Sequence, residues 1–148
     1  MSTYTQILYH IVFSTKNREK NLYTNNREEL FKYISGVIDN KKCHLYQING
    51  VEDHLHILTS LHPSISLSDL VKDIKVSSSL FIKKNNLFPK FTSWQEGYGG
   101  FTVSMYLKDS LIDYIKNQEA HHHKVTYIEE FINLLKQHEI EFDPKYLI

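Results

Sequence analysis

The stretch CHLYQINGVEDHLHILTSL, residues 43–61, decides the fold that we expect. Its two ends, residues 43–50 and 54–61, carry the β-branched, aliphatic and aromatic residues that are typical of strands. The segment that joins them, Gly50-Val51-Glu52-Asp53, is suited to a turn. The stretch therefore predicts two antiparallel strands joined by a short connection.

Outward from this hairpin, the sequence predicts one strand at Tyr4–Phe13, with apolar side chains on both faces, and another at residues 100–106. Helices are expected where apolar residues recur at helical spacing, in most cases behind a capping pair. They are expected after Asn25 with Glu28, after Ser66 with Asp69, from about Leu107 to His121, and after Thr126 with Glu129. The tail, Ile140–Ile148, is expected to pack as an extended segment.

The resulting order is β-α-β-β-α-β followed by two helices. Its first six elements match a ferredoxin-like (RRM-like) α+β fold, in which an antiparallel sheet carries helices on one face. The first and third strands are central neighbours in this topology, so residues 54–61 would lie in the middle of the sheet. We find no repeat, linker or low-complexity segment, and therefore expect a single domain over residues 1–148.

Composition limits the functional classes. The 17 basic and 17 acidic residues cancel, so a nucleic-acid surface would have to be local. Residues 1–100 have a formal charge of +3 and residues 101–148 one of −3. The one cysteine, Cys43, excludes an intramolecular disulfide, and the sequence contains no apolar run long enough to span a membrane. With no signal peptide evident at the start, we expect a cytoplasmic protein.

Two short patterns carry candidate chemistry. In His54-Leu55-His56, alternate residues of a strand share a face, so both imidazoles can bind one divalent metal ion. Tyr114 and Gln118 lie one turn apart on the expected helix, so an amide oxygen can complete the metal site beside a phenol nucleophile. Few protein ligands with open positions suit Mg²⁺ or Mn²⁺. Taken separately, each pattern also fits ordinary residues: half-buried strand histidines, a helical Tyr and an exposed Gln.

Three stretches together resemble the single-tyrosine HUH transposases, which move insertion sequences as single-stranded DNA. The first is YHIVFSTKNR, residues 9–18, and the second is GVEDHLHIL, residues 50–58. The third is WQEGYGGFTVS, residues 94–104, followed by YIKNQE at 114–119 and by His121-His122. The match follows the chain in order. Gly100 stands where Ala is common in the family, a change that should leave the chemistry intact.

This resemblance implies that Tyr114 is the nucleophile and that His54, His56 and Gln118 are the metal ligands. It implies a transposase that cleaves and rejoins single-stranded DNA beside hairpins, through a covalent 5′-phosphotyrosine and with a free 3′-hydroxyl. It further implies a homodimer whose sites are composite, because the catalytic helix of one subunit can pack against the partner's histidine pair.

Several other residues have alternative interpretations. Tyr98 is a rival nucleophile, but it sits between glycines and lacks a helical ligand partner. We favour a turn role for Asp53 over orientation of a histidine, and we favour a helix-end role for the His121–His123 run over metal binding. Gly97, Gly99 and Gly100 fit either a hinge or a loop that needs positive φ. Candidate phosphate contacts are Lys16, Arg18, Lys20, Lys72, Lys75, Lys83, Lys84 and Lys90, with His121 and His122 bordering the DNA.

Two alternatives stay open. One is a domesticated HUH nuclease that acts on repeat hairpins of its host, or an HUH replication initiator. The other is a ferredoxin-like module that binds nucleic acid without catalysis, which would leave the histidine pair and the Tyr114–Gln118 spacing unexplained.

Overall fold

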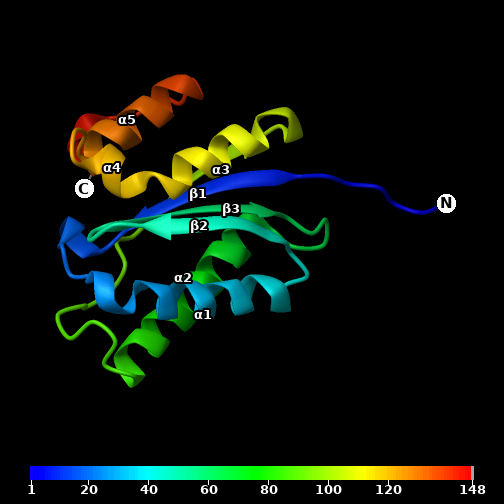
Figure 1. Cartoon of the computed structure of the whole chain (residues 1–148). Coiled ribbons are helices and arrows are strands. Elements are labelled where there is room, and N and C mark those ends of the chain that lie inside the picture. The colour runs from blue at the N-terminus through cyan, green and yellow to red at the C-terminus, as the bar shows by residue number, and fades with distance from the viewer. Residues whose placement is uncertain (148) are drawn as a thin grey trace.

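The computed structural model describes residues 1–147. Four strands form one antiparallel sheet: β1 (Leu8–Ser14), β2 (Leu45–Gly50), β3 (His54–Ser60) and β4 (Gly99–Val103). Their order across the sheet is β2-β3-β1-β4 (Figure 1). The expected α+β topology is confirmed, with β1 and β3 as the two central strands.

Helices cover both faces of this sheet (Figure 1). The helices α1 (Arg27–Asn40) and α2 (Leu67–Lys84) pack on one face, as expected for the ferredoxin-like unit. The opposite face lies under the C-terminal helices α3 (Lys108–Lys116), α4 (Gln118–His122) and α5 (Tyr127–Gln137). Short 3₁₀ turns occupy Lys16–Arg18, Thr24–Asn26, Met105–Leu107 and Pro144–Tyr146. The sheet therefore separates an α1/α2 layer from an α3–α5 layer.

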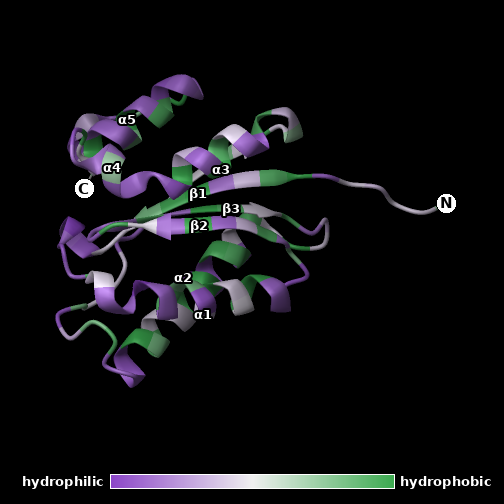
Figure 2. Cartoon of the chain, in the orientation of Figure 1, coloured by the Kyte–Doolittle hydropathy of each residue, from purple (hydrophilic) through white to green (hydrophobic). Residues whose placement is uncertain are grey.

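Alternation along β3 divides its side chains between these two layers. Leu55 and Ile57 are fully buried in the main core with residues of α1 and α2. Leu58 points to the other side and packs with Ile115 of α3. Figure 2 shows the neighbouring central strand β1 as hydrophobic toward its carboxyl end, where both faces are covered. The two-residue period thus directs His54 and His56 to the α3–α5 side.

The expected C-terminal catalytic helix is interrupted. Asn117 leaves the helical range (φ −97°, ψ 22°), so α3 ends at Lys116 and α4 begins at Gln118. The Asn117 side-chain amide donates to the carbonyl of Asp113 at 2.9 Å. Asparagine side chains compete for backbone acceptors in this way and disfavour helix interiors. The break rotates α4 relative to α3 while Tyr114 and Gln118 stay close in sequence.

Other boundaries also differ from expectation. β1 begins at Leu8, and Tyr4 is 88% exposed, because no strand or core covers it. The fourth strand ends at Val103, three residues early. Ser66 and Thr126 cap α2 and α5 as expected, each accepting from the backbone amide three residues on. Asn25 instead lies in a 3₁₀ turn, and α1 starts two residues later.

The C-terminal tail is extended in part, with the 3₁₀ turn at Pro144–Tyr146. Asp143 accepts from the backbone amide of Lys145 at 3.1 Å and so stabilises that turn. Ile148, the end of the expected tail, lies outside the described residues. Among the helices that residues 1–147 form, none combines the length and apolar character needed to cross a membrane.

Candidate metal and nucleophile site

The two strand histidines are fully buried beneath the C-terminal helices. His54 faces Ser14 across the β1–β3 ladder, and His56 faces Val12. Both imidazoles point to the α3–α5 side, with ring centroids 5.1 Å apart. The strand pattern therefore predicted their shared face correctly, and central strands hold both rings rigidly.

The helical residues Tyr114 and Gln118 converge on this pair within one chain. The Gln118 side-chain oxygen lies 3.2 Å from Nε2 of His54. The Tyr114 ring packs edge-on against His56, with centroids 5.9 Å apart. The four residues selected from the sequence thus meet at one place. Gln118 is fully buried, which contradicts the alternative of an exposed helical glutamine.

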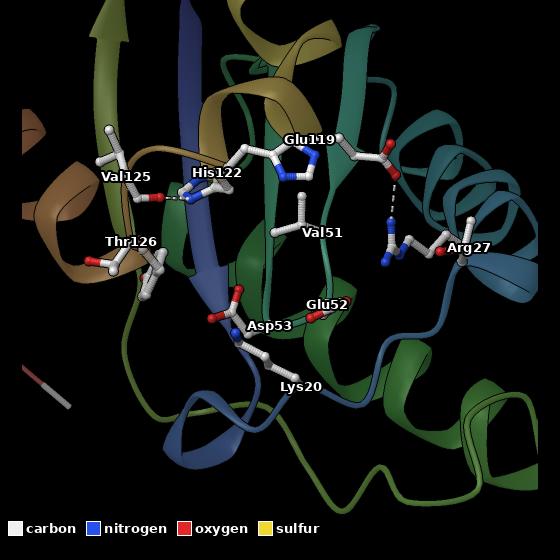
Figure 3. Close-up of a pocket in the computed structure, with 12 residues that line it drawn as sticks. Lys20, Arg27, Val51, Glu52, Asp53, Glu119, His122, Val125 and Thr126 are labelled. Atoms are coloured by element: carbon white, nitrogen blue, oxygen red, sulfur yellow. Dashed lines mark hydrogen bonds and ion pairs between the residues drawn. The ribbon is translucent and has the colours of Figure 1, made fainter.

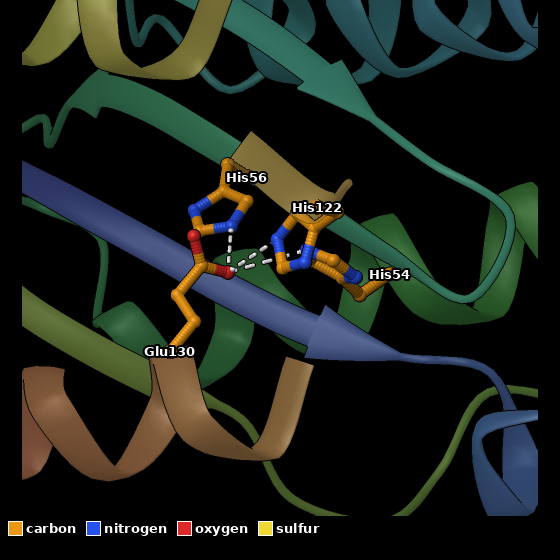
Figure 4. Close-up of side chains that lie close together, drawn as sticks. All are labelled: His54, His56, His122 and Glu130. Atoms are coloured by element: carbon orange, nitrogen blue, oxygen red, sulfur yellow. Dashed lines mark hydrogen bonds and ion pairs between the residues drawn. The ribbon is translucent and has the colours of Figure 1, made fainter. Parts of the chain in front are cut away.

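A carboxylate and a third histidine join them, as Figure 4 shows. Glu130 of α5 is 2% exposed, and its Oε1 lies 2.8 Å from Nε2 of His56 and 3.1 Å from Nε2 of His122. The same oxygen is 3.3 Å from Nε2 of His54. One ligand atom from each of these four residues falls within 4.8 Å of the others. His122, for which we favoured a helix-end role over metal binding, therefore lies among the candidate metal ligands.

The second Glu130 oxygen, Oε2, faces the nucleophile candidate. The Tyr114 hydroxyl donates a hydrogen bond to it, and the Gln118 side-chain amide donates to it at 3.1 Å. His121, 30% exposed, lies 3.2 Å from the same oxygen and 3.4 Å from the Tyr114 hydroxyl. Burial raises the pKa of Tyr114, and the neighbouring Glu130 carboxylate raises it further. The phenol is therefore protonated in this arrangement and acts as a hydrogen-bond donor.

Each of the three histidines has its Nδ1 held by a different partner. Nδ1 of His54 lies 2.7 Å from Asp53 Oδ1, and Nδ1 of His122 lies 2.6 Å from the Val125 carbonyl. Because both partners can only accept, these Nδ1 atoms must donate. His10 of β1 lies behind His56, with its Nε2 2.7 Å from His56 Nδ1. A histidine whose Nδ1–H is held in this way presents Nε2 to a metal ion.

The donor set consequently fits a divalent cation: three Nε2 atoms, a carboxylate and the Gln118 amide oxygen converge, and two of the Nδ1–H groups have obligate acceptors. Our preference for a simple turn role of Asp53 is corrected, since its carboxylate orients His54. Three nitrogens with one carboxylate suit Mn²⁺ better than Mg²⁺, which prefers oxygen ligands.

The electrostatics of the group differ from one histidine to the next. Burial lowers the pKa of His56 to about 4, although the Glu130 carboxylate opposes this. Burial also acts on His54, but hydrogen bonds to Asp53 and Glu130 outweigh it and raise its pKa. Glu130 remains ionised because the three imidazoles lower its pKa more than burial raises it. Without a metal, Glu130 is thus an ionised carboxylate surrounded by the Nε2 atoms of three imidazoles.

The candidate DNA contacts lie in several different places. Lys16 and Arg18 follow β1, at the edge where the sheet meets the loop before β4. Lys72, Lys83 and Lys84 are exposed on α2, on the sheet face opposite the Tyr114 site. Their roles stay predictions. Lys75, by contrast, is half-buried and directs its ammonium inward, donating to the carbonyls of Gln95 (2.7 Å) and Gly97.

In the glycine-rich loop, Gly97 meets a requirement of the backbone conformation and Gly99 a requirement of packing. Gly97 has φ of +84°, a conformation that favours glycine. A Cβ on Gly99 would lie 2.7 Å from the Phe131 ring, so the close approach of this ring of α5 to β4 favours glycine there. Tyr98 is 40% exposed and lines a separate hollow with Phe131 and Tyr146. These positions favour the loop interpretation over the hinge, and they place Tyr98 outside the candidate site.

A cavity of about 410 Å³ opens beside the histidine group (Figure 3). His122, Asp53 and Lys20 are among the residues that line it. Arg27 of α1 is buried and pairs with Glu119 of α4 at 3.0 Å across it. The cavity gives the metal group a polar, solvent-accessible side between α1 and α4.

With this geometry established, comparison with known proteins decides the family. Residues 3–118 match the model of the family described as transposase IS200 like. The chain belongs to this family. Its relationship to the single-tyrosine HUH transposases, inferred above from three stretches and the site residues, is thereby confirmed.

Individual relatives agree with this assignment. The chain is 29% identical over 115 residues to the transposase for insertion sequence element IS200 of Salmonella typhimurium, covering 74% of this chain and 75% of that protein. The IS200 transposase of Salmonella typhi matches equally. A putative transposase from Deinococcus radiodurans has the same fold (TM-score 0.63, 22% identity, 80% of this chain and 95% of that one).

A REP-associated tyrosine transposase bound to a REP hairpin is also similar in fold (TM-score 0.61, 19% identity). The similarity covers 84% of this chain and 76% of that one.

Sequence reasoning missed Glu130 and His10 and gave His122 a different role. A signal existed for Glu130, because it lies three residues after Tyr127 and four before Leu134 and so shares the buried face of α5. A similar signal marks His10, which occurs between Leu8 and Val12 on one face of an apolar strand. Both are polar residues at positions where periodicity demands apolar ones.

Proposed function

We propose that this IS200-like transposase cleaves and rejoins single-stranded DNA at hairpin-bearing element ends, with Tyr114 as the nucleophile. The supporting observation is the convergence of the histidine pair on β3 with Tyr114 and Gln118 from the α3–α4 segment, in a chain whose residues 3–118 match the family. Separately, these motifs fit ordinary structural roles, whereas together they place a phenol beside metal-ligating groups.

The reaction that we propose is a transesterification. The Tyr114 oxygen attacks a phosphodiester phosphorus, the new O–P bond gives a 5′-phosphotyrosine, and the bond to the 3′-oxygen breaks. The phenol loses one proton and the 3′-oxygen gains one, so no cofactor is consumed and rejoining needs no ATP. A divalent cation would neutralise charge on the phosphate oxygens. His54, His56 and Gln118 would hold it, with His122 and Glu130 as further ligands from the same cluster.

The proposed partners are a DNA hairpin and a second copy of the chain. A fold neighbour is bound to a REP hairpin, which supports hairpin binding here. That neighbour also supports a second candidate, action on repeat hairpins away from element ends. In our proposal the homodimer has composite sites, formed by exchange of the α3–α4 segment between subunits. Mixing Tyr114→Phe protein with His56→Ala protein would test exchange, because only composite sites would restore activity to the mixture.

The function is tested with labelled single-stranded DNA from the flanks of the gene, incubated with and without Mn²⁺ or Mg²⁺. We expect a denaturation-resistant protein–DNA adduct that requires metal. Tyr114→Phe should lose the adduct yet retain hairpin binding, whereas Tyr106→Phe, which removes a hydroxyl from a 93% exposed ring, should retain both. An undiminished adduct in Tyr114→Phe would exclude Tyr114 as nucleophile. Unrelated repeat hairpins, offered as competitors, distinguish the two DNA classes.

A further inference from the structure

Glu130 lies where the metal group and the nucleophile meet, and its two oxygens face different partners. Oε1 lies 2.8 to 3.3 Å from the Nε2 atoms of His54, His56 and His122. Oε2 accepts the hydrogen bond of the Tyr114 hydroxyl. One rigid carboxylate therefore spans the distance between the cation ligands and the reacting oxygen.

Burial of a carboxylate at this place is not explained by a contribution to folding stability alone. Glu130 is 2% exposed, and replacing buried ionic groups with apolar ones is often neutral or stabilising. The surrounding helix fixes the group instead of leaving it free to move. Thr126 caps the start of α5, and Tyr127 packs against His54 with ring centroids 4.6 Å apart. The Thr126 cap and the packing of Tyr127 on His54 thus hold the turn of α5 that carries Glu130.

Glu130 and His122 also lie beyond residues 3–118, the part of the chain that matches the family model. They come from α4 and α5, which pack over the sheet after the matched region ends. This pair of side chains therefore comes from the part of the chain that follows the matched region.

We propose that Glu130 couples metal binding to the position of the nucleophile. In this arrangement, which rests on the function proposed above, Oε1 is a ligand of the cation while Oε2 holds the Tyr114 hydroxyl beside it. Binding of the cation then fixes the carboxylate, and the carboxylate fixes Tyr114. Glu130 acts as a hydrogen-bond acceptor that positions the phenol.

Three variants separate this role from a structural one. Glu130→Gln keeps the shape but removes the charge, and Glu130→Asp keeps the charge but is too short to contact both partners. Glu129→Gln is the matched control, since Glu129 is exposed on the same turn of α5. Far-UV circular dichroism establishes that each variant is folded, and Glu130→Asp keeps the test decisive if the neutral variant unfolds.

Two measurements need no DNA. Calorimetric titration with Mn²⁺ should show a dissociation constant raised about tenfold or more in Glu130→Gln and unchanged in Glu129→Gln. In protein labelled with fluorotyrosine, the Tyr114 resonance is assigned by its loss in Tyr114→Phe. It should shift when Mg²⁺ is added to the wild type, and should not respond to Mg²⁺ in either Glu130 variant.

With DNA and Mn²⁺, adduct formation should slow about 100-fold in both Glu130 variants, because the phenol is no longer held in line. Unchanged Mn²⁺ affinity in Glu130→Gln, or a Tyr114 resonance that still responds to Mg²⁺ there, would overturn the coupling. Absence of any adduct from the wild type would instead refute the proposed function. In that case the titration and the fluorine spectra would still decide the role of Glu130.

Discussion

The Asp53 carboxylate gives the most direct test of how the metal group is assembled. Its Oδ1 lies 2.7 Å from Nδ1 of His54, which is fully buried. In Asp53→Asn an amide oxygen can still accept from Nδ1–H, but the negative charge is gone. A hydrogen bond to a charged group contributes about 1.5–3 kcal/mol, and one between neutral groups about 0.5–1.5 kcal/mol. The loss in metal binding should therefore be about 1 kcal/mol.

A loss of that size corresponds to a rise of about fivefold in the Mn²⁺ dissociation constant. Asp53→Ala, which removes the acceptor completely, should raise it about 10- to 100-fold. Both are measured by isothermal titration at pH 7.5, with Glu52→Gln as the control because Glu52 is the exposed acid of the same turn. Equal affinities for wild type, Asp53→Asn and Asp53→Ala would refute the argument that His54 is oriented through Nδ1.

Three further outcomes are expected. Lys75→Met should lower the free energy of unfolding by about 1.5–3 kcal/mol, because two carbonyls lose a charged donor, whereas Lys72→Met should leave it unchanged in urea denaturation. Gly99→Ala should destabilise the protein by about 1–3 kcal/mol, because the new Cβ would contact the Phe131 and Phe101 rings. Gly100→Ala should destabilise it by less, because the flexible end of the Leu67 side chain faces that position; thermal melts compare the two variants. In metal-free protein, the pKa of His56 is about 4 in the folded state and about 6.5 in the unfolded state, so only the unfolded chain takes up a proton between these values. The free energy of unfolding should therefore fall by roughly 3 kcal/mol as the pH drops from about 6.5 to 4. Unfolding curves that coincide at pH 7 and pH 4.5 would contradict this burial argument.

The fold was predictable because its signals are local. Alternation in β3 and capping at Ser66 and Thr126 depend on neighbours in sequence, and the structure confirms them. The expected helix through Asn117 failed because one side chain competes for a backbone carbonyl, an effect that apolar periodicity does not report. Lys75 is similar, since the loop carbonyls that bind its ammonium are about twenty residues away in sequence.

The candidate site was predictable only in halves. Spacing identifies His54 with His56, and Tyr114 with Gln118, because each pair lies within one element. Nothing in spacing indicates that α5 returns a carboxylate to the same place, since Glu130 is 74 residues from His56. Long-range packing alone determines that contact. The one local indication is that Glu130 is a polar residue on an otherwise apolar face of α5. This predicts that Glu130 has a buried partner but does not identify that partner.

The hydrogen-bond partners of His54, His56 and His122 explain how side chains from separate elements form one ordered site. Asp53 holds His54 from the β2–β3 turn, His10 holds His56 from the adjacent central strand, and the Val125 carbonyl holds His122 from the α4–α5 connection. His54 and His56 are thus held from within the sheet, and His122 is held from the α4–α5 connection. Each Nε2 is directed inward by a separate contact, so the sheet and the C-terminal helices bring the ligands together where they pack. The break at Asn117 has the same effect on the helical side. It frees α4 to turn toward the sheet, so that Gln118 and His122 reach the group from one short helix while Tyr114 reaches it from another.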